Sequence, residues 1–198
     1  IVSGTIRVDL RDQSAQAGAN AFTSSNLSSL IGAWHHLAVT YDGRGGPTAA
    51  QGLNIYIDGV AASLVRSTGA AYVAMENLAA PLQIGRNGPS WQQYDGGLDD
   101  VRLWAVARTP AELQASMAVE LLGNEPGLAA YWRFNEGSGP TAADAVAGGG
   151  VVTLLNGTSW QLGGPLASTE PDVTAPDITD LGISGLTHQQ VTVTFTTG

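Results

Sequence analysis

The chain has 198 residues and 43% hydrophobic content, enough for one sandwich-sized core but too little for two complete domains of that kind. Its 17 acidic residues against 8 basic ones give a formal charge of −9, which argues against a nucleic-acid partner because a phosphate backbone needs a basic face. The absence of cysteine excludes disulfides, thiol catalysis and zinc–cysteine sites, and no apolar run approaches the roughly 20 residues of a membrane span.

The first sixty residues are predicted to form strands joined by turns. Apolar and polar residues alternate over 6–10, and this period of two is the pattern of a half-buried strand. Residues 12–29 are rich in serine, alanine and asparagine, so a polar connection is expected there. Two further alternating strands follow at 34–43 and 53–59. The second ends in Asp58–Gly59, a dipeptide favoured in type I′ hairpin turns, whose two central residues need positive φ.

Beyond this hairpin, further strands and one helix are expected. The helix is predicted over 108–123, because Thr109 can cap its first turn, Pro110 suits position N1, and Glu112 at N3 completes a capping box. Gly123 is expected to end it. The strands are expected near 61–66, 82–86 and 98–104, and within 128–139 and 151–160.

Three motifs carry a resemblance to a known family. They are WHHLAVTYDG at 34–43, the strand that ends in Asp58–Gly59, and GGLDDVRLW at 96–104 followed by the helix. In this order they resemble the laminin G-like and pentraxin-like domains of the concanavalin A-like lectin/glucanase superfamily. The resemblance, assigned to residues 1–162, implies an all-β antiparallel jelly-roll sandwich with one short helix. Similar members carry several strands before the first motif, so the N-terminal strands of the sandwich are expected to be missing.

The rest of the chain is expected to lead into a second domain. Residues 163–176 are rich in proline, serine and threonine, the composition of an extended linker. From there, 177–198 resemble the truncated start of a fibronectin type III or immunoglobulin-like β-sandwich. Such modular strings are typical of extracellular bacterial chains. We therefore expect a segment of a secreted or cell-surface multidomain bacterial protein, with any signal peptide outside this sequence.

Calcium is the one cofactor to consider, and three carboxylates are its candidate ligands. Asp99 is expected to point to the interior side of its strand, where a carboxylate must be hydrogen-bonded, paired or metal-bound. Because calcium needs six to eight oxygen ligands, Asp58 or Asp95 would have to contribute as well. The alternatives are a plain turn role for Asp58 and hydrogen bonds from backbone amides or a histidine for Asp99. Asp100 and Arg102 are expected to form a solvated pair.

The loop 87–97 is the candidate ligand-binding segment. Trp91 and Tyr94 lie in it off any strand period, and exposed rings can stack on the apolar face of a sugar. The alternative is that both rings fold back over the edge of the sandwich. Asn87, Gln92 and Gln93 are the other candidate ligand contacts in this loop. The remaining tryptophans are expected to pack in the core or at its edge: Trp34, Trp104, Trp132 and Trp160.

The expected function is a non-catalytic extracellular module that binds a glycan or a protein partner, as in adhesion. Two alternatives stay open, namely a polysaccharide-acting hydrolase or its accessory domain, and a structural spacer without a ligand. Glycosidases on this fold place carboxylates at i and i+2 of one strand, about 5 to 5.5 Å apart in retaining enzymes. No predicted strand carries such a pair, which favours the binding module. The oligomeric state is left open.

Overall fold

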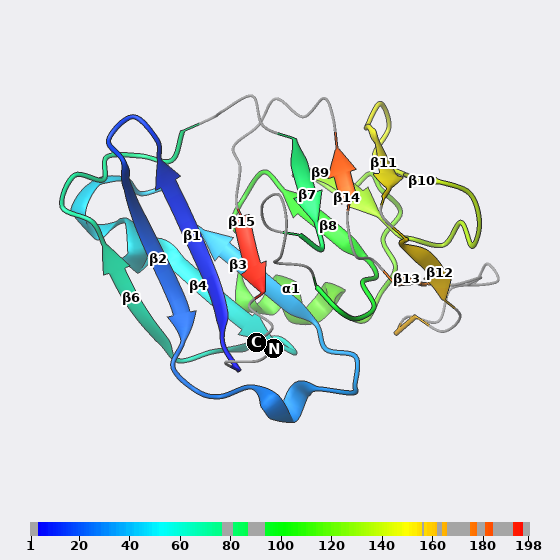
Figure 1. Cartoon of the computed structure of the whole chain (residues 1–198), viewed down its shortest axis with the longest axis horizontal. Helices are drawn as coiled ribbons and strands as arrows, with labels where there is room; N and C mark the ends of the chain where they lie inside the picture. Colours follow the sequence, from blue (N-terminus) through cyan, green and yellow to red (C-terminus); the bar gives the residue numbers. More distant parts are fainter. Residues whose placement is uncertain are drawn as a thin grey trace. The chain divides into compact units, whose positions relative to one another are not determined.

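The computed structural model describes residues 4–76, 81–86, 94–155, 157–161 and 164–165, and the backbone of 175–177, 181–183 and 192–195 (Figure 1). The chain divides into two compact units. Unit 1 comprises Ile1–Ala79, Ala107–Met117 and Thr187–Gly198, and unit 2 comprises Ala80–Val106 and Ala118–Leu186.

Unit 1 is built from two antiparallel sheets and short helical segments. Its strands are β1 (Ile6–Asp12), β2 (Ala17–Thr23), β3 (Leu37–Tyr41), β4 (Leu53–Ile57), β5 (Val60–Ala61), β6 (Leu64–Thr68) and β15 (Thr192–Phe195). Its helical segments are η1 (Ser28–Leu30), η2 (Gly46–Gly52) and α1 (Pro110–Ser116). One sheet has the order β15-β1-β2-β6 and the other β3-β4-β5, and Figure 1 shows β1 and β2 as adjacent blue strands.

The core of unit 1 lies between these two sheets. Ile6 and Leu10 of β1 are buried, as the alternation over 6–10 predicts, and they belong to one cluster with Leu53 and Ile55 of β4. Fully burying side chains of this size contributes about 1.5–3 kcal/mol each. Because the cluster draws residues from both sheets, unit 1 is a sandwich.

Strand β2 lies where the sequence predicts a polar connection, so that expectation for residues 12–29 is wrong. The inward positions of β2 are Ala19, Ala21 and Thr23, all buried. These side chains are short and one is polar, so the alternation contains no large apolar residue that would mark a strand. The strand is held by pairing with β1 on one side and β6 on the other.

Helix α1 begins as predicted and ends earlier. The hydroxyl of Thr109 accepts a hydrogen bond from the amide of Glu112 (3.3 Å), and the Glu112 carboxylate accepts one from the amide of Thr109 (2.8 Å). The predicted capping box is therefore confirmed. The helix ends at Ser116, so the expectation that Gly123 ends it is wrong. The hydroxyl of Ser116 donates to the carbonyl of Glu112 four residues earlier (2.8 Å), a side-chain bond that slightly destabilises a helix.

Unit 2 is also made of antiparallel strands. They are β7 (Leu82–Ile84), β8 (Val101–Trp104), β9 (Leu128–Trp132), β10 (Thr141–Ala143), β11 (Val151–Leu154), β12 (Ser159–Gln161), β13 (Ala175–Asp177) and β14 (Leu181–Ile183). The sheet orders are β10-β11-β14-β7, β8-β9 and β12-β13. Trp132, Phe134 and Val152 are fully buried in one cluster, so the core prediction for Trp132 is confirmed.

The described strands of the C-terminal segment pair with earlier strands of the chain. β13 pairs with β12, β14 lies between β11 and β7, and β15 pairs with β1. This pairing differs from the expectation that 177–198 starts a separate sandwich, and the domain boundaries stay a prediction. The predicted all-β fold is confirmed, since antiparallel strands predominate among the described residues and the helices are short. No helix in the described ranges is long and apolar enough to cross a membrane.

Candidate functional site

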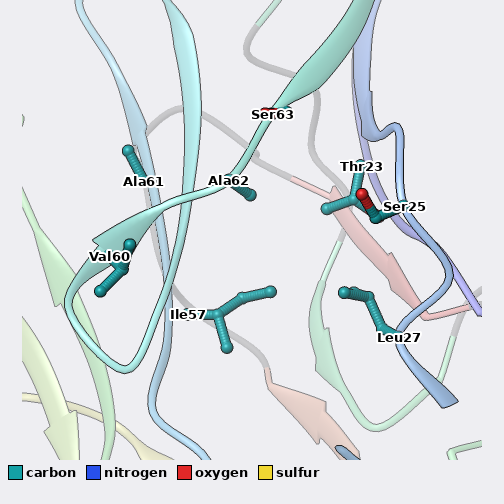
Figure 2. A pocket seen from close by; sticks show the side chains of 8 residues that line it. All are labelled: Thr23, Ser25, Leu27, Ile57, Val60, Ala61, Ala62 and Ser63. Carbon is teal, nitrogen blue, oxygen red and sulfur yellow. The ribbon is translucent and has the colours of Figure 1, made fainter. Parts of the chain in front are cut away.

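Unit 1 carries a pocket of about 200 Å³. It is formed where β2 ends, at the hairpin between β4 and β5, and at the connection from β5 to β6. Figure 2 shows the side chains of Leu27 and Ile57 pointing toward one another, with Thr23 and Ser25 close together beside them. The lining residues are Thr23, Ser25, Leu27, Ile57, Val60, Ala61, Ala62 and Ser63.

The β4–β5 hairpin forms one wall of this pocket. Asp58 and Gly59 have φ values of 50° and 75°, so the predicted turn with two left-handed residues is confirmed. This turn pairs Ile57 directly with Val60. A tight hairpin therefore brings two branched apolar side chains to the same edge of the pocket.

Backbone hydrogen bonds fix the wall formed by the end of β2. The amide and the hydroxyl of Ser24 both donate to the carbonyl of Ser63, at 2.9 and 3.2 Å. The hydroxyl of Thr23 accepts a bond from the amide of Ile6 (3.1 Å) and is buried. These contacts tie the end of β2 to β1 and to the connection into β6, so the pocket has ordered walls.

Asp58, a predicted calcium ligand, has both carboxylate oxygens engaged. One lies 2.8 Å from Nδ1 of His35, and the other accepts a hydrogen bond from the amide of His36 (2.9 Å). Burial acts to raise the pKa of Asp58, but these hydrogen bonds hold it below its ordinary value. These two bonds fit the alternative role of Asp58 in the turn, and calcium ligation by Asp58 stays a prediction.

Trp34 is the predicted core tryptophan next to the two histidines that bind Asp58. It directly precedes His35, and its side chain is 42% exposed. The expectation that Trp34 packs in the core or at its edge is therefore wrong. Strand β3 begins only at Leu37, so Trp34 lies outside the alternation that would have turned it inward.

In unit 2, the carboxylate of Asp100 is bound by the side chains of Tyr131 and Arg102. The φ of Asp100 is 52°, and strand β8 begins just after it at Val101. The hydroxyl of Tyr131 donates to its carboxylate, and Arg102 pairs with it at 3.1 Å. The predicted pairing of Asp100 with Arg102 is confirmed, but their side chains are only 15% and 9% exposed, so the prediction that the pair is solvated is wrong. Burial raises the pKa of Asp100, although Tyr131 and Arg102 act to lower it.

The wider network around Tyr131 fastens the segment that contains Val119 and Leu121 to the paired strands β8 and β9. The guanidinium groups of Arg102 and Arg133 lie 5.1 and 5.2 Å from the centre of the Tyr131 ring, within cation–π range. Arg102 also donates to the carbonyl of Val119 (2.6 Å), and Arg133 donates to that of Leu121 (2.7 Å). Both guanidinium groups bind backbone carbonyls of their own unit, so these interactions stabilise the fold of unit 2.

The remaining predicted metal ligands lie near this strand. Asp99 is partly buried, and its carboxylate accepts a hydrogen bond from the amide of Asp100 (3.1 Å), whereas Asp95 is exposed. Within the described part of the chain, no three His, Asp or Glu side chains gather as a metal-binding group. These observations bring no set of calcium ligands together around Asp99.

Most of the predicted sugar-binding loop lies outside the described residues. Of its two aromatic rings, that of Tyr94 is partly buried and packs over Gly96, where a Cβ atom would lie 2.8 Å from the Tyr94 oxygen. The stacking platform that pairs this ring with Trp91 is untested. Its other candidate contacts are likewise outside the described ranges: Asn87, Gln92 and Gln93.

Sequence reasoning missed the pocket, because its lining comes from three separate segments with no shared motif. The hairpin motif around Asp58 is the one sequence signal that marks the position of the pocket.

Residues 2–114 match a laminin G family model described as the concanavalin A-like lectin/glucanases superfamily. Searches of curated proteins and of solved structures give no match. Because the family match spans more than half of the chain, this chain belongs to the concanavalin A-like lectin/glucanases superfamily.

Proposed function

We propose that this chain is a non-catalytic extracellular binding module that holds a glycan or a protein partner at the unit 1 pocket. The observation that carries the proposal is the chemistry of the lining. All eight lining residues are uncharged, five being apolar and three bearing hydroxyl groups. Mostly apolar pockets with a few polar groups are the usual form of a ligand site.

The lining also argues against catalysis at this pocket. General acid–base chemistry needs a titratable group within hydrogen-bond reach of the reacting atoms, and the lining contains none. The superfamily includes glucanases, but laminin G-like domains are generally non-catalytic. No strand in the described ranges carries carboxylates at i and i+2, the arrangement expected of a glycosidase on this fold.

Asp100 is the residue that would most favour an enzyme, because raised carboxyl pKa values are common among catalytic acids. Its carboxylate already accepts bonds from Tyr131 and Arg102, and those groups in turn bind the loop of unit 2. Structural ion-pair networks also shift pKa values. A structural role therefore accounts for Asp100 without a substrate.

We also propose that the loop 87–97 contacts the ligand. If it does, Trp91→Ala should weaken glycan binding and leave stability unchanged. Calcium binding by Asp58, Asp95 and Asp99 is a further prediction of the same kind. Calorimetric titration of the protein with CaCl₂ would measure it directly, and an absence of heat would end it.

The experiment that tests the proposed function measures binding and turnover on the same sample. The protein is applied to a glycan array and to immobilised extracellular proteins, and is also incubated with soluble polysaccharides while new reducing ends are assayed. Retention on one of the two surfaces without any new reducing ends is expected. Release of sugar would favour the hydrolase, and an absence of binding to both surfaces would favour the spacer.

A further inference from the structure

We infer that the occupant of the unit 1 pocket is an extended, basic protein segment that inserts one aliphatic side chain. This inference rests on the proposed function and narrows its ligand from a glycan or a protein to a protein. Four features of the pocket and its rim support it, namely the lining, the volume, the adjoining strand edge and the charge.

The lining offers few groups for binding a sugar, since its polar side chains are the hydroxyls of Thr23, Ser25 and Ser63. It contains no aromatic ring on which the apolar face of a sugar could stack. The carbonyl of Ser63 already accepts two bonds from Ser24, and the hydroxyl of Thr23 accepts one from Ile6. The facing side chains of Leu27 and Ile57 instead offer an apolar slot (Figure 2). An aliphatic group is favoured there because it buries its apolar surface against apolar walls.

The volume of the pocket suits one side chain. At about 200 Å³ it is smaller than the roughly 300–1,000 Å³ of small-molecule sites. An apolar cavity of about 150 Å³ is large enough to hold benzene. The pocket can therefore accept a group of the size of a leucine side chain, but not several sugar units.

The strand beside the pocket has an edge that can take a partner strand. β5 is at the end of the sheet β3-β4-β5, and among the described strands its pairing is with β4 alone. Val60 on this strand is 67% exposed. Unpaired strand edges bind extended peptides through main-chain hydrogen bonds, with alternate side chains entering neighbouring pockets. If a peptide pairs with β5, one of its side chains can enter the pocket.

The charge at the rim favours a basic segment. Asp58 lies in the turn between Ile57 and Val60, and its carboxylate is 50% exposed beside His35. The whole chain carries a formal charge of −9. A lysine next to the inserted aliphatic residue would be attracted to this rim, and a positive partner would be steered toward the acidic chain.

The test uses a capped, fluorescein-labelled peptide of sequence Thr-Lys-Leu-Lys-Thr and fluorescence anisotropy. One control peptide has glycine for leucine, and a second has glutamate for both lysines. The leucine–lysine peptide should bind at least about tenfold more tightly than either control. Equal binding of the glycine peptide would overturn the aliphatic pocket, and equal binding of the glutamate peptide would overturn the basic segment.

Two variants place the peptide on the structure. Val60→Lys puts a charge at the pocket rim, and Val65→Lys adds the same charge at an exposed position of β6 that does not line the pocket. Val60→Lys should weaken peptide binding about tenfold, and Val65→Lys should change it less than twofold. Equal loss in both variants would overturn the location. Ala62→Leu, which fills the pocket, should act like Val60→Lys if its thermal unfolding stays cooperative.

The inference and the proposed function can fail separately. If a glycan from the array binds and is lost in Val60→Lys while the peptide does not bind, the peptide inference is overturned and the binding module stands. If neither peptide, glycan nor extracellular protein binds, both are overturned.

Discussion

The two units each contain an aspartate in a left-handed backbone conformation, and the comparison shows how strongly surroundings decide what such a residue does. Asp58 and Asp100 have nearly equal φ values, 50° and 52°. Asp58 is half exposed, pairs with His35 and has a lowered pKa, whereas Asp100 is 15% exposed and has a raised one. The local conformation is the same, but burial reverses the direction of the pKa change.

The two aspartates also have different roles in the molecule. The turn at Asp58 presents the edge of β5 and one wall of the pocket, so it belongs to the surface that we propose binds a ligand. Asp100 joins Tyr131 and Arg102 in a network closed on its own unit. Substitutions at Asp100 should therefore affect stability, and substitutions around Asp58 should affect binding more than stability.

The largest effect on stability is expected from Asp100→Ala. It leaves the buried guanidinium of Arg102 without its counter-charge, and breaking a buried pair in this way costs about 3 kcal/mol. Urea unfolding monitored by fluorescence would measure the loss. Asp100→Asn is the matched control, because it also removes the counter-charge but keeps a hydrogen-bond acceptor and tolerates positive φ. It should therefore keep a large part of the cost, and an Asp100→Asn variant as stable as the parent would contradict the ion-pair explanation.

Tyr131→Phe should have the next largest effect. It removes the hydroxyl that donates to Asp100 and that accepts a hydrogen bond from the amide of Leu121 (3.3 Å). A loss of about 1–2 kcal/mol is expected for such a buried group. In an Asp100→Asn background the loss should be smaller, since the two residues share an interaction. Strict additivity in this double-mutant cycle would show that the two groups are not coupled.

Asp58→Asn should cost under about 1 kcal/mol, because exposed pairs contribute little and asparagine suits the same turn. The same unfolding experiment measures it. A cost as large as that of Asp100→Ala would remove the contrast between the two turns.

The smallest effects expected are pH dependences of opposite sign. The folded-state pKa of Asp100 lies above the ordinary 3.8, so its contribution to stability grows as the pH falls toward 4 and is lost as the pH rises through the raised pKa. The folded-state pKa of Asp58 lies below 3.8, so its contribution is present above about pH 4 and is lost as the pH falls through the lowered pKa. Unfolding of each Asn variant against the parent from about pH 7 to 3 would show these trends, and slopes of equal sign would contradict them.

Local sequence rules predicted much of this fold. The alternation over 53–57 and the Asp58–Gly59 pair correctly predict β4 and its turn, and Thr109 with Glu112 correctly predicts the start of α1. These features depend on residues within one turn or one strand. β2 was missed because its inward side chains are small, so its burial depends on neighbouring strands.

The candidate site was less predictable, because it depends on contacts between distant segments. Leu27 and Ile57 face one another in the pocket although thirty positions separate them in the sequence. A regular alternation over 98–104 predicts that Asp100 faces solvent, but its left-handed conformation breaks the period before β8 begins. The partner that buries it, Tyr131, lies on another strand.

The central claim is that unit 1 binds the ligand and that the Asp100 network is structural. Amide chemical-shift mapping tests it most directly, with ¹⁵N-labelled protein titrated with the leucine–lysine peptide. The account predicts shifts at Ser25, Val60 and Ser63 around the pocket, with the same pattern in a folded Asp100→Asn variant. Shifts confined to unit 2, or their loss in Asp100→Asn alone, would contradict it.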